Sequence, residues 1–298
     1  MTRLRIAAAQ YPPEALPSLG ACRDKLARWV SEAAGNGAEL LVFPEYGAME
    51  YAAAEGASGA GDLGAFLAAV SDALPEMDAA HADLARRYGV HILAASGPSA
   101  RGGRFVNAAR LIAPSGRIGT QEKLIMTPFE RDWGLSGGSG LKVFETALGC
   151  IAVAVCYDSE FPLVVRAQAE AGAEIVLIPS CTEFISGYHR VRTAALARAL
   201  ENACVTVLSP TVGDAPWSPA IDRNAGAAGV FAPADRGLSD TGVLAAGALN
   251  QPQWVYADVD LERFRAVKAC GEMRNATDWP LQPGAAPLAQ HVEVAVLS

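Results

Sequence analysis

Three ionisable side chains follow short apolar stretches of the sequence. Glu45 comes after Leu40–Phe43 and Pro44, Lys123 lies near the end of an apolar-periodic stretch, and Cys156 follows the run IAVAV. Catalytic groups of α/β proteins collect at strand ends, so these three are candidates for one site. A cysteine nucleophile needs a base, a buried carboxylate of raised pKa serves as one, and an ammonium stabilises an oxyanion. Glu, Lys and Cys together therefore suffice for acyl transfer.

Taken singly, each of these residues has a simpler explanation. A glutamate after a strand is most often a cap neighbour or a surface charge, and a lysine there is usually solvated. A cysteine among Val and Ala is more often a core residue than a nucleophile. The usual base for a cysteine is histidine, but His81, His91 and His291 fall within a predicted helix, at a strand start and in the tail. His189, in the first turn of a predicted helix, stays open as an alternative base.

The elements that must position these residues alternate along the chain. Apolar periodicity predicts strands over 4–9, 40–43, 91–96, 174–179, 204–210 and 226–232, and helices over 18–35, 63–73, 76–88, 161–171, 187–203 and 260–270. Hairpins are predicted for 104–113 with 117–124, 141–146 with 150–156, and 241–247 with 253–259. Segment 51–62 is expected to be a loop, and 291–296 a strand. This mixture favours layered sheets covered by helices, in one domain over 1–298 with 279–298 as a C-terminal tail.

Composition excludes several classes of protein. The chain has 298 residues, 51% of them hydrophobic and 19% charged, which excludes disorder. A net charge of −8 without a basic cluster argues against nucleic-acid binding. The apolar runs are far shorter than the ~20 residues that span a membrane, and no export signal precedes Gln10, so we expect a cytoplasmic protein without a membrane role. The six cysteines show neither CxxC pairs nor metal-ligand spacing, so we expect reduced thiols and no metal site.

Three blocks of the sequence resemble the signature motifs of the carbon–nitrogen hydrolase, or nitrilase, superfamily. They are VFPEYG at 42–47, EKLIMTPFERDWG at 122–134 and VAVCYDSEFP at 153–162, in the same order and with matching spacing. Further similarity extends from about residue 4 to 265. The resemblance implies a four-layer αββα sandwich that carries a Glu–Lys–Cys triad.

The resemblance also implies roles for individual residues. It makes Glu45 the base, Lys123 the lysine and Cys156 the nucleophile of the triad. Glu130 occupies the place of a second glutamate that orients the lysine or the substrate amide; the alternative is a surface glutamate. The backbone N–H of Tyr157 is expected to be a second oxyanion donor, because it directly follows the nucleophile.

Tyr157-Asp158 follows the cysteine where true nitrilases of the superfamily carry Trp-Glu. The chain is therefore similar to the amidase-like branch, which implies hydrolysis of a small linear amide through a thioester, without a cofactor. An N-carbamoyl amine hydrolase or a nitrilase on the same triad, and a non-catalytic binding protein, remain alternatives. A Cys–His–Glu amidotransferase is disfavoured, because Cys156 lacks the Gly-x-Cys-x-Gly elbow.

Substrate contacts are predicted from the same blocks. Glu160 stands where ω-amidase-like members have an arginine, and Leu163 replaces their glutamate, which favours a neutral or cationic amide unless Glu160 only caps the following helix. The residues predicted to line the pocket are Tyr46, Phe129, Tyr157, Glu160, Cys181 and Thr182.

Family members commonly pair through their helix layers. The resemblance thus implies a homodimer, or a multiple of one, with 160–171 and 187–203 at the contact. The alternating tail strand is predicted to cross to a neighbouring subunit; the alternative is that it closes its own sheet.

Overall fold

Strands of small and β-branched residues, buried on both faces, build the centre of the protein. A computed structural model describes residues 3–56, 62–272, 274–282 and 292–297. In the first strand Ile6 and Ala8 face one apolar cluster, while Ala7 and Ala9 face another. This alternation with a period of two places one face of the sheet against a second sheet and the other face against helices.

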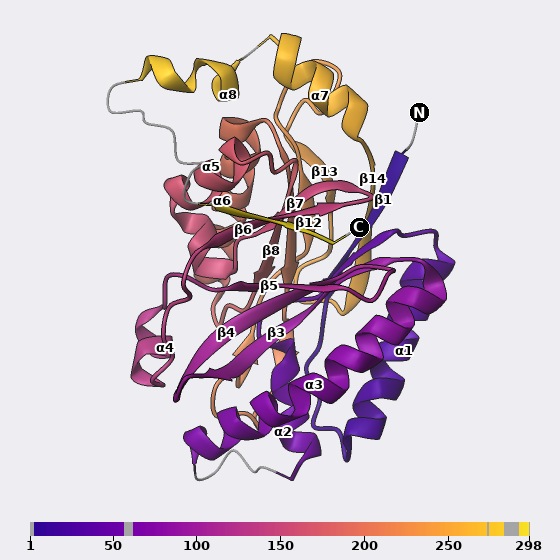
Figure 1. Cartoon of the computed structure of the whole chain (residues 1–298), viewed down its shortest axis with the longest axis vertical. Coiled ribbons are helices and arrows are strands. Elements are labelled where there is room, and N and C mark those ends of the chain that lie inside the picture. The colour runs from indigo at the N-terminus through magenta and orange to yellow at the C-terminus, as the bar shows by residue number, and fades with distance from the viewer. Residues whose placement is uncertain (1–2, 57–61, 273, 283–291, 298) are drawn as a thin grey trace.

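The first sheet has six strands in the order β14-β1-β2-β3-β4-β5 (Figure 1). β1, β2 and β3 run parallel to one another, and the remaining pairs are antiparallel. The strands are β1 Arg3–Gln10, β2 Leu40–Val42, β3 His91–Arg101, β4 Arg104–Ile112, β5 Ile118–Glu122 and β14 Gln253–Asp260.

The second sheet has seven strands in the order β13-β12-β9-β8-β7-β6-β15. β7, β8 and β9 are parallel, as are β15 and β6. The strands are β6 Leu141–Thr146, β7 Gly149–Val153, β8 Ile175–Ser180, β9 Val205–Pro210, β12 Gly229–Phe231, β13 Val243–Ala246 and β15 Val292–Val296, while β10 Gly213–Asp214 and β11 Arg223–Asn224 form a separate ribbon.

Two pairs of helices cover the outer faces of the sheets. α1 Leu19–Gly35 and α3 Leu63–Tyr88 pack on the first sheet, and α5 Pro162–Glu170 and α6 Ile185–Asn202 pack on the second (Figure 1). The layers are thus α, β, β, α, which confirms the predicted sandwich. The remaining helices of the described residues are η1 Gly47–Met49, α2 Glu50–Ala54, α4 Pro128–Asp132, η2 Cys156–Glu160, α7 Leu261–Cys270, α8 Asn275–Asp278 and η3 Trp279–Leu281.

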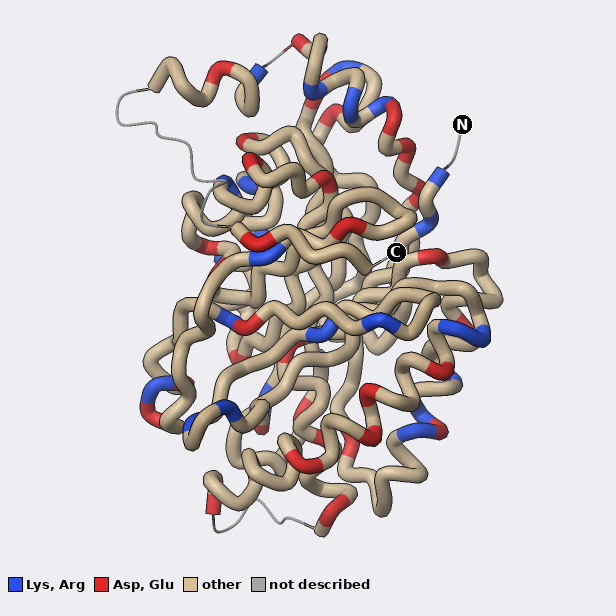
Figure 2. The backbone as a smooth tube through the Cα atoms, viewed as in Figure 1, with Lys and Arg blue, Asp and Glu red and all other residues tan. Residues whose placement is uncertain are grey.

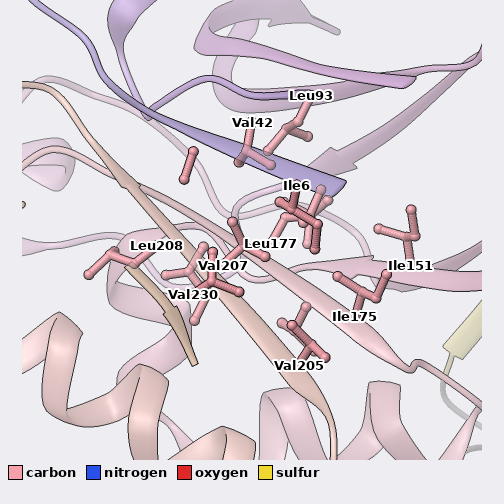
Figure 3. Packing of buried hydrophobic residues seen from close by; sticks show 14 of the residues in the cluster. Ile6, Val42, Leu93, Ile151, Ile175, Leu177, Val205, Val207, Leu208 and Val230 are labelled. Atoms are coloured by element: carbon pink, nitrogen blue, oxygen red, sulfur yellow. The ribbon is translucent and has the colours of Figure 1, made fainter. Parts of the chain in front are cut away.

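Apolar side chains packed between the two sheets hold the sheets together. Ile6 and Val42 of the first sheet face Leu177 and Val207 of the second (Figure 3). Each buried methylene contributes about 0.8 kcal/mol to this packing. A polar link is added by Ser209 of β9, whose hydroxyl lies 2.8 Å from the carbonyl oxygen of Ala9 and 2.9 Å from that of Val42. These contacts join the sheets near the carboxyl ends of β1, β2 and β9.

Some predicted elements were wrong. Helices 63–73 and 76–88 form one helix, α3, that contains Pro75, because buried residues such as Leu74 and Met77 on both sides keep one apolar face against the sheet. Segment 51–62 was expected to be a loop, but α2 extends to Ala54; residues 57–61 lie outside the described residues.

The predicted hairpin of 241–247 with 253–259 was also wrong. β13 pairs with β12 in the second sheet, whereas β14 pairs with β1 in the first. The chain crosses between the layers beside Gln10, whose side-chain amide donates to the carbonyls of Ala248 and Gln251. Apolar alternation is the same for a hairpin and for two strands in different sheets, so periodicity does not distinguish them.

The tail strand belongs to the second sheet. β15 pairs in parallel with β6 of its own chain, from Val292 opposite Leu141 to Val296 opposite Glu145. The predicted crossing to a neighbouring subunit is therefore corrected to the alternative, in which the strand closes its own sheet. The start of the predicted strand at His291 lies outside the described residues.

Charged residues are distributed over the whole fold. In Figure 2 the Lys and Arg positions are interspersed with Asp and Glu positions along the chain.

Among the described residues, no helix has both the length and the apolar character needed to cross a membrane.

Candidate active site

A cavity of about 610 Å³ opens where strands of both sheets end. Glu45 follows β2 and Lys123 follows β5 of the first sheet, whereas Cys156 follows β7 and Cys181 follows β8 of the second. All ten residues predicted for the site line this cavity: Glu45, Tyr46, Lys123, Phe129, Glu130, Cys156, Tyr157, Glu160, Cys181 and Thr182.

Two of these residues adopt a backbone conformation that is uncommon for side chains other than glycine. Tyr46 has φ 56° and Cys156 has φ 46°. Strained residues of this kind cluster at functional sites, where the surrounding fold holds them in place. β7 ends at Val153 rather than at the predicted residue 156, so Cys156 opens the short helix η2 instead of closing a strand. The chain turns sharply at Cys156 although this cysteine lacks the two glycines of a Gly-x-Cys-x-Gly elbow.

Lys123 lies between two carboxylates at the base of the cavity. Its Nζ is 2.8 Å from Glu45 Oε1, 2.8 Å from Glu130 Oε1 and 2.7 Å from Glu130 Oε2. At most 2% of each of these residues is exposed. In this low-dielectric surrounding the ammonium is held charged by both carboxylates, which raise its pKa against the opposing effect of burial.

Glu130 is fixed as a carboxylate. Besides Lys123, it accepts from the Tyr46 hydroxyl at 2.6 Å and from the backbone N–H and hydroxyl of Thr127 at 2.8 and 2.9 Å. Burial by itself would raise its pKa, but Lys123 and these hydrogen bonds bring the pKa below its usual range. Glu130 therefore favours the ionised form and contacts Lys123 through both of its oxygens, and the alternative of a surface glutamate is wrong.

Glu45 has the opposite character. Burial and the neighbouring charge of Glu130 raise its pKa to about 7, against the lowering effect of Lys123. Lys123 and Asn107 both donate to Oε1 of Glu45. Burial and the charge of Glu45 raise the pKa of the Cys156 thiol. The arrangement suits a neutral thiol that gives its proton to Glu45 as it attacks.

We expect kcat/KM to rise with pH through a midpoint near 7. A base acts only when it is ionised, so protonation of Glu45 removes activity below this midpoint, and ionisation gives a plateau above it. Initial rates measured from about pH 5 to about pH 9 check this. Asp158 titrates in the same range, with a pKa that burial raises to about 6. Asp158→Asn should therefore retain the midpoint. If kcat/KM of the wild type did not fall below pH 7, this would contradict Glu45 as the base.

Asp158 connects the turn that carries Cys156 to the segment that follows Lys123. Its carboxylate accepts from the backbone N–H of Leu124 at 3.0 Å and of Ile125 at 2.8 Å, directly after Lys123. The helix η2, which follows β7 of the second sheet, is thus hydrogen-bonded to the residues that follow β5 of the first sheet. In the sequence, Asp158 stands only as part of a motif, and nothing there indicates this contact.

Other residues of the site escaped sequence reasoning. Asn107, in the middle of β4, contacts both glutamates and had no sequence signal. Thr127 caps α4 together with Glu130, and the Thr-x-x-Glu spacing could have revealed this capping box. Trp133, Arg190 and the segment 219–223 also line the cavity.

The mouth of the cavity combines aromatic and charged side chains. Phe129 is 64% exposed and Phe184 is 55% exposed. Glu160 forms an ion pair with Arg190 at 3.6 Å, and burial raises its pKa against the opposing effect of this arginine. Glu160 is therefore neither an unpaired charge nor a helix cap. The sequence-based argument that an unpaired Glu160 favours cationic substrates is corrected by this ion pair.

Cys181 and Thr182 follow β8 beside the nucleophile. The carbonyl oxygen of Cys181 lies 3.8 Å from the sulfur of Cys156, and the Cys181 thiol donates to Asn224 at 3.1 Å. The hydroxyl of Thr182 donates to the carbonyl of Ala225 at 2.7 Å. Cys181 thereby attaches the cavity wall to β11, and Thr182 attaches it to the residue that follows β11.

Histidine is absent from the cavity lining in the described part of the chain. His81 is buried in α3, where its ring nitrogen contacts the Met77 carbonyl at 2.7 Å and burial lowers its pKa to about 4. His189, the alternative base, packs beside Tyr188 and does not line the cavity. Among the described residues that line the cavity, Glu45 is the candidate base.

Comparison with known proteins places this architecture in a family. The model of the carbon-nitrogen hydrolase family matches residues 5–269. The chain belongs to the carbon–nitrogen hydrolases. A probable hydrolase of Bacillus subtilis, YhcX, is 41% identical to this carbon–nitrogen hydrolase over 197 residues, which are 66% of the chain and 38% of YhcX. The chain thus spans less than half of that relative's length.

Further relatives of this carbon–nitrogen hydrolase cover more of their own length. An omega-amidase of Danio rerio is 26% identical over 254 residues, which cover 80% of the chain and 82% of that protein. A carbon-nitrogen hydrolase of Helicobacter pylori has the same fold, with a TM-score of 0.74, 21% identity and coverage of 90% and 92%. An amidase of a Nesterenkonia species, with acrylamide added to its active-site cysteine, has a TM-score of 0.65, 23% identity and coverage of 89% and 97%.

Proposed function

We propose that this carbon–nitrogen hydrolase cleaves a small linear amide through a thioester on Cys156 and releases a carboxylic acid and ammonia or an amine. One observation carries the proposal. At the base of the cavity, Lys123 contacts both Glu45 and Glu130, and Cys156 lines the same cavity close enough to Glu45 for this carboxylate to raise the pKa of the thiol. A base, a cation and a nucleophile are thus assembled in a buried, low-dielectric site.

The reaction follows from these positions. Cys156 Sγ attacks the amide carbon while Glu45 takes the thiol proton, and the oxyanion is stabilised by the positive charge of Lys123 and by a hydrogen bond from the backbone N–H of Tyr157. Glu45 then gives its proton to the leaving nitrogen as the C–N bond breaks. In the second half, Glu45 takes a proton from water, which attacks the thioester carbon, and the proton returns to the departing sulfur.

An amide is favoured over a nitrile by the Tyr157-Asp158 pair and by the omega-amidase and amidase among the relatives. Nitrilases are also among the relatives, so the nitrile is the second candidate. Because Arg190 balances the charge of Glu160, we propose uncharged amides as the first substrates to test.

The test is a panel of amides, N-carbamoyl amines and nitriles, followed by ammonia release and by mass spectrometry of Cys156. Ammonia together with carboxylic acid from amides, and an acyl adduct on Cys156, are expected. Ammonia from nitriles alone would assign a nitrilase. No turnover of any compound and no adduct on Cys156 would support a binding protein instead.

We also propose that the chain forms a homodimer through its α5–α6 layer. Four large apolar side chains there are 41–60% exposed: Leu163, Phe184, Ile185 and Leu200. Light scattering at micromolar concentration should give about twice the chain mass of 31.0 kDa. Leu163→Glu with Leu200→Glu should yield monomers, whereas Leu281→Glu, at an 81% exposed position outside this layer, should not. A monomeric mass for the wild type would refute the proposal.

A further inference from the structure

Asn107 is an uncharged side chain placed between the two glutamates of the site. It lies in the middle of β4 and is fully buried. Its Nδ2 is 2.9 Å from Glu45 Oε1 and 3.4 Å from Glu130 Oε1. These are the two oxygens that Lys123 also contacts, so Asn107 and Lys123 hold the same pair of carboxylates.

The other end of this amide has no partner. Oδ1 of Asn107 is a buried acceptor without a hydrogen bond among the described residues. An unsatisfied buried acceptor lowers stability, and such exceptions in a native protein require an explanation. The explanation lies in the opposite end of the side chain, because only the NH₂ group is compatible with two carboxylate oxygens.

Lys123 does not suffice to hold Glu45 alone. Its three N–H groups match its three short contacts, of which a single one goes to Glu45. A carboxylate held by one donor rotates about that contact. A second donor on the same oxygen, provided by the neighbouring strand, fixes the carboxylate plane.

We propose that Asn107 is a positioning residue that fixes Oε1 of Glu45, directs Oε2 to the Cys156 thiol and favours the ionised form of the base. This inference rests on the proposed function of Glu45. The titratable or charged groups facing Glu45 are Lys123 after β5, Glu130 of α4, Cys156 of η2, Cys181 after β8 and Tyr46. Asn107 adds a hydrogen bond to this cluster without adding a charge, so its donation stabilises the carboxylate at every pH.

The test replaces Asn107 with leucine, which has nearly the same shape and no donor. Two profiles are measured against pH: kcat/KM for the best amide, and the rate of iodoacetamide alkylation at Cys156, mapped by mass spectrometry. Asn107→Leu should move the midpoint of both profiles upward by about one pH unit, because the ionised base loses a donor. At the plateau kcat should fall by about 10- to 100-fold and KM should change by less than about threefold.

Asn202 offers a matched control. It is also buried, donates one hydrogen bond to the Arg198 carbonyl at 3.0 Å and has an unpaired Oδ1, but it lies at the end of α6. Asn202→Leu should leave both midpoints unchanged, whatever its effect on stability. If Asn107→Leu fails to fold, Asn107→Ser removes the same amide and should shift the midpoints in the same direction.

An unchanged midpoint with uniformly lower rates would make Asn107 a structural residue and overturn the inference, as would wild-type behaviour. Alkylation of Cys156 needs no substrate turnover. A wild type that hydrolyses nothing would contradict the proposed function, whereas the alkylation midpoints would still decide the role of Asn107.

Discussion

Cys156→Ala and Glu45→Gln should each lower amide hydrolysis by at least about 10³-fold, because one removes the proposed nucleophile and the other removes the proposed base. Both changes remove a group without leaving an unpaired charge, so the fold should persist by circular dichroism. The double variant should be little worse than either single one, since the two groups act as a unit.

Lys123→Ala should lose activity to a similar extent and also lose stability. Without the ammonium, Glu45 and Glu130 remain buried side by side, and breaking a buried ion pair costs about 3–5 kcal/mol. Thermal unfolding separates this loss of stability from the loss of activity.

The control for Cys156→Ala is Cys204→Ala, since Cys204 is buried directly before β9 and outside the cavity. Wild-type turnover in Cys156→Ala would end the proposal.

Glu130→Gln should lower kcat by about 10²-fold and move the acidic limb of kcat/KM to lower pH. The charge of Glu130 is one of the causes that raise the pKa of Glu45 to about 7, so its removal makes Glu45 a stronger acid. Lys123, left with fewer partners, then interacts more with Glu45, which acts in the same direction.

The sign of this shift is opposite to that expected for Asn107→Leu, and pH–rate profiles of both variants therefore distinguish a neighbouring charge from a neighbouring donor. Glu183→Gln, at an exposed position of the cavity mouth, is the control and should leave the limb in place. A limb that moves to higher pH in Glu130→Gln would contradict the assignment of a fixed negative charge.

The residues at strand ends were the part of the site that sequence reasoning could reach. Apolar runs that stop before Glu45 and Cys156 already indicate where a sheet edge lies, and the three motifs add Glu130 through resemblance. The αββα layers could be predicted for the same reason, because alternating strands and amphipathic helices leave few ways to bury both faces of each sheet.

Contacts between distant segments could not be predicted in this way. Asn107 sits inside β4, where its spacing is that of any strand residue, and its partners are 62 and 23 positions away in the chain. Arg190 meets Glu160 from another helix, so the charge of Glu160 was misjudged from local sequence alone. The separation of β13 from β14 likewise depends on packing between layers rather than on periodicity.

The proposed catalytic groups come from both sheets, because Glu45 and Lys123 follow strands of the first sheet and Cys156 follows a strand of the second. Their alignment is thus a property of how two layers rest on each other, maintained by interlayer side chains such as Val207 and by the Ser209 and Asp158 links. A displacement of about 1 Å between reacting groups costs about 10²-fold in rate. We therefore expect methyl groups buried well away from the cavity to tune turnover, so a mutational survey confined to the cavity wall would overlook the residues that set the distance between the proposed base and nucleophile.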